Sequence, residues 1–258
     1  MKTRRDPVRW QPVRPSPVFL AVVGIAIIGG AVAWTTELGT TRAKFAVFLL
    51  VIAGWVVSIC LHEFMHAFIA WRAGDRDVEA RGYLTLNPLK YSHPLLSIGL
   101  PLLFIALGGI GLPGGAVYIR PGQFSTRTQR LISVSGPAAN VVLAVILLAV
   151  VRLFADNEHY TFWFGMSFLA FLQVTAALLN LLPVPGTDGY AILEPSLSYD
   201  NRRALEQFKP YGMLILMALL FLPPINMLFF DAVYALFELS GIPSDWASAG
   251  GTLTQFWR

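Results

Sequence analysis

Two histidines and a glutamate stand close together in an otherwise apolar stretch of the chain. They belong to the motif H-E-F-M-H at positions 62–66, and Cys60 is the only other ionisable side chain between residues 45 and 71. Residues four apart share one face of a helix, so His62 and His66 can bind a single tetrahedral zinc ion. Glu63 projects beside that face, where it can take a proton from water at the metal and return it to a leaving amine. The motif therefore predicts metal-assisted hydrolysis of a peptide bond.

The apolar surroundings of this motif favour a metal site. An ionisable side chain near the centre of a bilayer costs about 2.5 kcal/mol or more, so an unpaired set needs a partner such as a metal ion. The alternative is that the three side chains only cap or pair with neighbouring helices. Cys60, the single cysteine, lies two residues before His62 and so on roughly the opposite side of the helix, which predicts core packing and not a ligand.

The composition of the chain predicts an integral membrane protein. Of its 258 residues, 55% are hydrophobic and 13% are charged, and the mean hydropathy is +0.61. The net charge of +4 does not indicate a nucleic-acid partner, because the basic residues lie in short segments that flank apolar runs. One cysteine excludes an intrachain disulfide.

Apolar runs predict a polytopic α-helical membrane protein with about five to six transmembrane helices. We expect helices at about 18–34, 44–72, 131–154 and 162–182, and one kinked helix or two short ones at 211–239, where Pro223 and Pro224 interrupt the run. The first run ends in a sequence similar to a signal-peptide cleavage site, but its length favours a retained helix. The proline- and glycine-broken segment 98–112 predicts a re-entrant hairpin. The expected domains are a basic segment 1–17, a transmembrane domain 18–240 with a catalytic core at about 45–189, and a C-terminal tail 241–258.

The distribution of lysine and arginine predicts the orientation in the membrane. With the N-terminus in the cytoplasm, segments 1–17, 72–94, 120–130 and 194–210 lie on the same side and carry 15 of the 19 basic residues. His62 is ten residues before Arg72, about 15 Å along a helix. The expected site is therefore inside the bilayer of the cell membrane, toward the cytoplasmic side.

A third zinc ligand is expected from the acidic residues, and Asp188 is the best candidate. It lies in the sequence N-L-L-P-V-P-G-T-D-G at 180–189, in which two prolines and a glycine unwind the end of the fourth helix. Free backbone there lets a carboxylate turn inward at the depth of the histidines. The alternative is an ordinary turn aspartate next to glycine.

The pair of motifs, H-E-x-x-H and N-x-x-P-x-x-x-x-D-G, resembles the site-2 protease family of intramembrane zinc metalloproteases. The segments G-Y-L-T-L-N-P-L-K at 82–90 and S-G-P-A-A-N at 135–140 are similar to its short prokaryotic members, which lack PDZ and CBS domains. The resemblance implies one Zn²⁺ held by His62, His66 and Asp188, Glu63 as the catalytic base, and a transmembrane protein as the substrate. It also implies that Asn180 lies beside the zinc and donates to an oxyanion; an interhelical hydrogen bond is the alternative.

Two further segments have weaker patterns. Residues 78–86 alternate partly between apolar and polar, which predicts a short β element at the cytoplasmic interface, either a substrate-binding edge or a plain surface hairpin. Gly136 and Asn140 form a small-residue patch, for which we expect close helix packing and not a catalytic role.

The function predicted from these patterns is an intramembrane zinc endopeptidase that cleaves peptide bonds in or near transmembrane segments. The alternative is an ion- or proton-coupled transporter that uses the same intramembrane ionisable residues. A transporter is expected to show internal repeats, and neither motif is duplicated.

Overall fold

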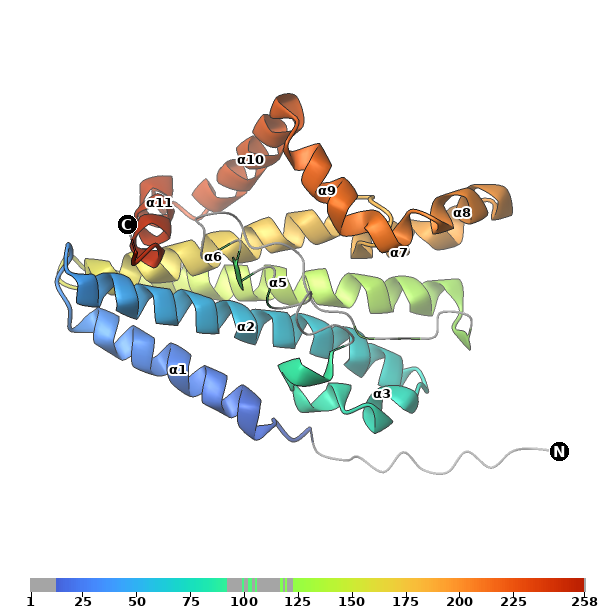
Figure 1. Cartoon of the computed structure of the whole chain (residues 1–258), viewed down its shortest axis with the longest axis horizontal. Coiled ribbons are helices and arrows are strands. Elements are labelled where there is room, and N and C mark those ends of the chain that lie inside the picture. The colour runs from blue at the N-terminus through green and yellow to red at the C-terminus, as the bar shows by residue number, and fades with distance from the viewer. Residues whose placement is uncertain are drawn as a thin grey trace.

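The protein is built around four long helices that alternate in direction. The computed structural model describes residues 13–91, 99, 102–103, 105, 117, 119 and 123–257. The long helices are α1 (Pro17–Trp34), α2 (Thr41–Arg72), α5 (Thr126–Phe154) and α6 (Tyr160–Leu181), and they lie side by side in Figure 1. The predicted helices are confirmed at these positions.

Two of these helices begin several residues before their apolar runs because polar side chains cap them. The Thr40 side chain accepts a hydrogen bond from the backbone N–H of Ala43 at 3.0 Å, and the Ser125 side chain accepts one from Thr128 at 3.2 Å. Such caps satisfy backbone donors that a helix start leaves free. The expected starts at 44 and 131 were too late for this reason.

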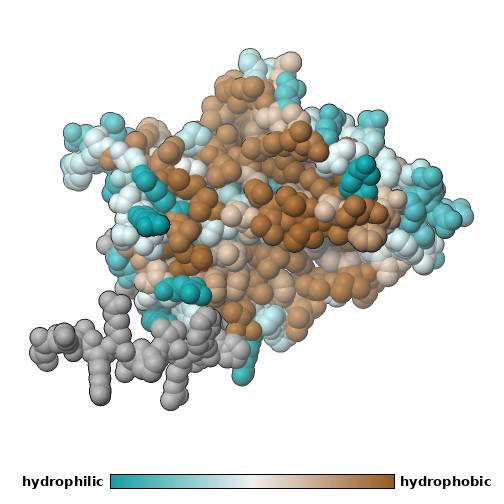
Figure 2. Space-filling model, turned by 180° about the vertical axis from the view of Figure 1, so that it is seen from behind, coloured by the Kyte–Doolittle hydropathy of each residue, from teal (hydrophilic) through white to brown (hydrophobic). Residues whose placement is uncertain are grey.

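The four long helices are long and apolar enough to cross a membrane, and a bent pair allows a fifth span. Figure 2 shows a broad hydrophobic surface across the middle of the molecule with hydrophilic surface toward both ends, as a membrane protein requires. Of the most apolar stretch of each helix, 61% is buried inside the protein in α2 and 72% in α6. The corresponding shares are 22% in α1 and 39% in α5. α2 and α6 are therefore the central helices, and α1 and α5 leave more of their surface to lipid.

The expected β element is wrong for residues 78–86. This segment forms α3 (Asp77–Ala80) and the 3₁₀ turn η1 (Tyr83–Thr85), followed by η2 (Pro88–Lys90). Gly82 and Leu86 have φ angles of +78° and +56°, so the backbone turns where a strand would need to stay extended. The part of the chain that the structure describes contains no strand, so no partner is present for one. The predicted re-entrant segment 98–112 lies largely outside the described residues.

The segment after α6 is a series of short helices. They are α7 (Asp188–Leu193), η5 (Glu194–Ser196), α8 (Tyr199–Glu206), η6 (Lys209–Tyr211), α9 (Gly212–Leu220) and α10 (Pro223–Glu238). The run 211–239 is thus two helices, bent by 91° at the prolines. Proline cannot continue a helix but is favoured in the first turn of a new one, which places the break before Pro223.

Residues 241–258 were expected to be a tail, but they contain the helix α11 (Ser244–Thr254), which packs against α6. A Cβ atom at Gly250 would lie 2.0 Å from the carbonyl oxygen of Phe164, so only glycine permits this approach. Figure 1 shows the C-terminus at the end of the bundle opposite to α3 and α8.

Candidate metal centre

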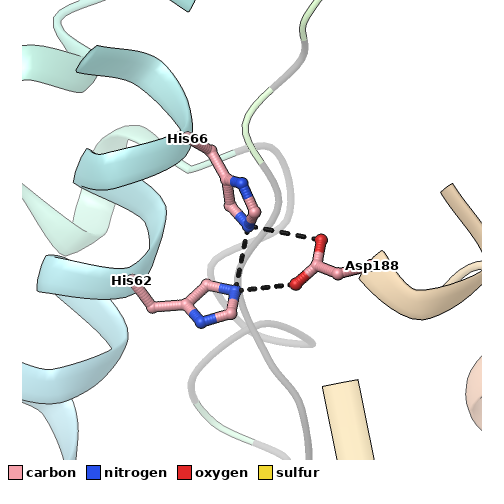
Figure 3. Close-up of side chains that lie close together, drawn as sticks. All are labelled: His62, His66 and Asp188. Atoms are coloured by element: carbon pink, nitrogen blue, oxygen red, sulfur yellow. Dashed lines mark hydrogen bonds and ion pairs between the residues drawn. The ribbon is translucent and has the colours of Figure 1, made fainter. Parts of the chain in front are cut away.

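His62 and His66 lie on the buried face of α2 and point to the same place. Each residue is 6% exposed, and their Nε2 atoms are 3.1 Å apart. The four-residue spacing places the two rings one turn apart on one face, as the motif predicts. Figure 3 shows both Nε2 atoms directed at Asp188.

Asp188 reaches the histidines because the chain folds back sharply after α6. Gly186 has a φ of +100°, and the side chain of Thr187 caps α7, whose first residue is Asp188. A Cβ atom at Gly189 would lie 2.2 Å from the carbonyl oxygen of Leu181, so α7 can fold this closely onto the end of α6 only with glycine at this position. The D-G pair therefore has a physical role. Glycine allows the chain to fold back onto α6, and this places the aspartate side chain beside the two histidines.

The three side chains form a group with the dimensions of a zinc site. Asp188 Oδ2 is 3.2 Å from His62 Nε2, and Oδ1 is 3.3 Å from His66 Nε2. A tetrahedral zinc with bonds of about 2.0–2.1 Å has ligand-to-ligand edges of about 3.3–3.4 Å. The Oδ2 atom is buried without a hydrogen-bond donor. Among the described residues, this is the cluster of histidine, cysteine and acidic side chains that could hold a metal ion.

The Nδ1 atom of each imidazole ring also has a hydrogen-bond partner. His66 Nδ1 lies 2.7 Å from the backbone carbonyl oxygen of Ile132, and His62 Nδ1 lies 2.5 Å from Asn140 Oδ1. A carbonyl oxygen can only accept, so His66 carries a proton on Nδ1, and in the neutral ring this leaves the lone pair at Nε2. Two imidazole nitrogens and a carboxylate are also a donor set that zinc takes in catalytic sites. The residues present thus fit a divalent metal.

Helix α5 also borders the site, through Gly136. A Cβ atom at Gly136 would lie 2.2 Å from His66 Nε2 and 2.6 Å from His62 Nε2. The close packing expected for Gly136 is confirmed, and its partner is the histidine pair. Asn140, for which close helix packing was expected, also forms a hydrogen bond with His62 that the sequence analysis did not predict. A polar residue in an apolar helix beside small residues was the signal for this contact.

Glu63 is buried beside the histidines, with 3% of its surface exposed. Its Oε2 atom accepts a hydrogen bond from the backbone N–H of Val117 at 3.1 Å. This bond holds the carboxylate in place without neutralising it. The sequence could not have predicted this contact, because the donor is a backbone N–H, a group that does not depend on the type of side chain.

Asn180 and Cys60 are the remaining residues that the sequence analysis considered for the site. Asn180 is buried in the last turn of α6, just before the loop that leads to Asp188. Cys60 is fully buried in α2 and does not belong to the candidate metal group, as expected for a core residue.

Comparison with known proteins gives clear relatives. The chain is 57% identical over 230 residues to a protein of Mycolicibacterium smegmatis named "Putative zinc metalloprotease Rip2", with 88% of each chain covered. It is 54% identical over 229 residues to the Mycobacterium tuberculosis protein of the same name, again with 88% of each covered. YwhC of Bacillus subtilis, also named as a zinc metalloprotease, is 30% identical over 182 residues, or 65% of this chain and 78% of YwhC. No protein-family model and no solved structure matches the chain.

A buried group of two histidines and a carboxylate, set among helices of membrane-spanning length, defines a multi-pass membrane zinc metalloprotease. The Mycolicibacterium and Mycobacterium relatives are named as zinc metalloproteases. The chain belongs to the site-2 protease family.

Proposed function

We propose that the protein is an intramembrane endopeptidase, which hydrolyses peptide bonds in or near transmembrane segments of membrane proteins. The observation that carries this proposal is the place of the metal group. His62 and His66 are buried in α2, one of the two central helices of a bundle whose surface is apolar. A substrate that reaches such a site must enter it from the bilayer or from its interface.

His62, His66 and Asp188 are the proposed zinc ligands. The two Nε2 atoms are 3.1 Å apart, and each lies 3.2–3.3 Å from one of the two carboxylate oxygens of Asp188, close to the ligand spacing of a tetrahedral zinc. With one ligand atom from each residue, a fourth coordination position is left for a reactant. When bound, zinc supplies Lewis-acid chemistry that polarises a peptide carbonyl and makes water a stronger nucleophile at neutral pH.

Glu63 is the proposed general base. It follows His62 directly in α2 and is close enough to both histidines and to Asp188 to interact with them electrostatically. Its carboxylate takes a proton from the attacking water and returns it to the nitrogen of the leaving amine. The hydrogen bond from Val117 holds it in one orientation. Asn180 is the proposed donor to the oxyanion, on the strength of its buried position at the end of α6.

The proposed orientation has the site toward the cytoplasm. Helices α3 and α8, which belong to two of the basic segments, lie at one end of the bundle in Figure 1. These segments belong to the side that carries most of the lysine and arginine, which is the cytoplasmic side in most membrane proteins. The C-terminus at the opposite end then faces away from the cytoplasm.

The activity test compares Glu63→Gln with wild-type protein, purified and reconstituted with a transmembrane peptide substrate. Glutamine keeps the size of the side chain but cannot accept the proton, so cleavage should fall by about 10²-fold or more while zinc content stays the same. Glu37→Gln is the matched control, because Glu37 is exposed in the connection between α1 and α2. Zinc content, measured by mass spectrometry, should be about one per chain in all three proteins.

Substrates with different helix stability extend the test. A peptide bond must leave the helix before it can be attacked, so a substrate with glycine and proline near the cleavage position should be cut faster than a uniform leucine helix. Undiminished cleavage by zinc-loaded Glu63→Gln would remove Glu63 from the mechanism. Ion or proton flux without cleavage would favour the transporter.

A further inference from the structure

A buried chain of hydrogen bonds starts at His62 and leads away from the metal group. His62 Nδ1 is 2.5 Å from Asn140 Oδ1 in α5, and Asn140 Nδ2 donates to Gln173 Oε1 in α6 at 2.9 Å. Gln173 Nε2 then donates to the hydroxyl oxygen of Ser58 at 2.7 Å. This hydrogen-bonded chain runs from His62 in α2 through α5 and α6 and back to α2. It ends at Ser58, one helical turn before His62.

The Ser58 end of this hydrogen-bonded chain determines which atom donates and which accepts at each step. The Ser58 hydroxyl carries one proton and lies 3.0 Å from two backbone carbonyl oxygens of its own helix, which can only accept. With its proton directed there, Ser58 accepts from the Gln173 amide, and the Gln173 oxygen is left to accept from Asn140. The Asn140 oxygen therefore faces His62. It accepts the Nδ1 proton and leaves the lone pair on Nε2, where a metal ligand needs it.

The side chains of this hydrogen-bonded network are buried, where an unpaired polar group is costly. Asn140, Gln173 and Ser58 are 3%, 1% and 3% exposed, on helices whose other buried residues are mostly apolar. Apolar side chains of similar shape fill such positions without loss of stability, whereas a broken polar network leaves unpaired groups. A complete network of three side chains that ends on a candidate ligand therefore indicates a task at that ligand.

We propose that Gln173 and Ser58 are positioning residues, which act through Asn140 to fix the proton and the ring orientation of His62. This inference rests on the proposed function, because it takes His62 as a zinc ligand. Partners behind metal-binding histidines raise metal affinity or activity by about 10- to 100-fold. Neither Gln173 nor Ser58 contacts the metal group, so their effect must pass through the asparagine.

The test measures zinc affinity by competition with a chromophoric chelator, together with the visible absorption spectrum of the Co²⁺-substituted protein. Gln173→Leu should weaken zinc binding by about 10- to 100-fold and alter the Co²⁺ bands, because Asn140 loses the acceptor that orients it. Ser58→Ala should act in the same direction to a smaller extent. Ser58→Thr keeps the hydroxyl and should bind like wild type, since its methyl can enter the apolar crevice of about 540 Å³ that Ser58 borders.

Thr175→Val is the matched control. Thr175 is fully buried in α6, two residues after Gln173, and its hydroxyl donates to the Phe171 carbonyl in its own helix at 2.9 Å. It is buried and polar but not part of the chain, so zinc affinity and the Co²⁺ spectrum should stay unchanged. Thermal unfolding of the metal-free proteins separates a loss of zinc affinity from a loss of folded protein.

The outcomes distinguish this inference from the proposed function. Normal zinc binding by His62→Ala would refute the metal site itself. Loss of zinc by His62→Ala with wild-type affinity and Co²⁺ spectra in Gln173→Leu would refute the positioning role alone. Equal losses in Gln173→Leu and Thr175→Val would also refute it, because any buried polar substitution would then have the same effect.

Discussion

Substitution of Gly136 by alanine should abolish the metal site with a single methyl group. The added Cβ would lie 2.2 Å from His66 Nε2 and 2.6 Å from His62 Nε2. Zinc binds nitrogen at about 2.0–2.1 Å, so the methyl would stand close to where the metal belongs. Ordinary contact begins at 3.4 Å, which means that His66 Nε2 would have to move by at least 1.2 Å.

A displacement of this size has a large expected effect. Misplacement of a reacting group by about 1 Å costs on the order of 10²-fold in rate. We therefore expect Gly136→Ala to lose bound zinc and to cleave at least about 10²-fold more slowly. Because the closest atoms are the tips of side chains, the helix backbones need not move. The metal-free protein should accordingly stay folded.

The assay combines zinc content, peptide cleavage and thermal unfolding for Gly136→Ala and for Gly24→Ala. Gly24 lies within α1, and a Cβ atom there would meet nothing within 4 Å. The same substitution at this position should leave zinc and activity intact and add up to about 1 kcal/mol of helix stability. Stoichiometric zinc and normal cleavage in Gly136→Ala would refute the close approach of α5 to the histidines.

Three further outcomes are expected. Gly189→Ala should lower both zinc content and activity, because its Cβ would lie 2.2 Å from the Leu181 carbonyl oxygen and push Asp188 out of the site; wild-type zinc binding would contradict this. Cys60→Ala should keep one zinc per chain, since Cys60 is not in the metal group, and a loss of zinc would make it a ligand. In that cysteine-free background, a membrane-impermeant thiol reagent added outside intact cells should label a cysteine at Asn157 but not one at Arg203, and the reverse pattern would invert the proposed topology.

The sequence alone predicted the candidate residues of the site and the helices that carry them. His62, Glu63 and His66 lie within one helix, so their relation depends on helical periodicity and nothing else. The long helices followed from apolar runs, because a backbone in a bilayer must satisfy its own hydrogen bonds. Asp188 was found through prolines and glycines that unwind the chain near it. Each of these patterns involves residues near one another in the sequence, so it can be recognised without knowledge of the tertiary structure.

The tertiary structure decided what depends on contacts between distant segments. The segment 78–86 alternates like a strand but turns at Gly82, and no described strand is present to pair with it. Gly136 and Gln173 became meaningful only when α5 and α6 were placed against α2, since glycine and glutamine in apolar helices have many uses. A hydrogen bond between residues 33 or 115 positions apart depends on packing angles and depths that no local pattern encodes. The sequence specifies the candidate groups for the chemistry, and packing decides which groups hold them in place.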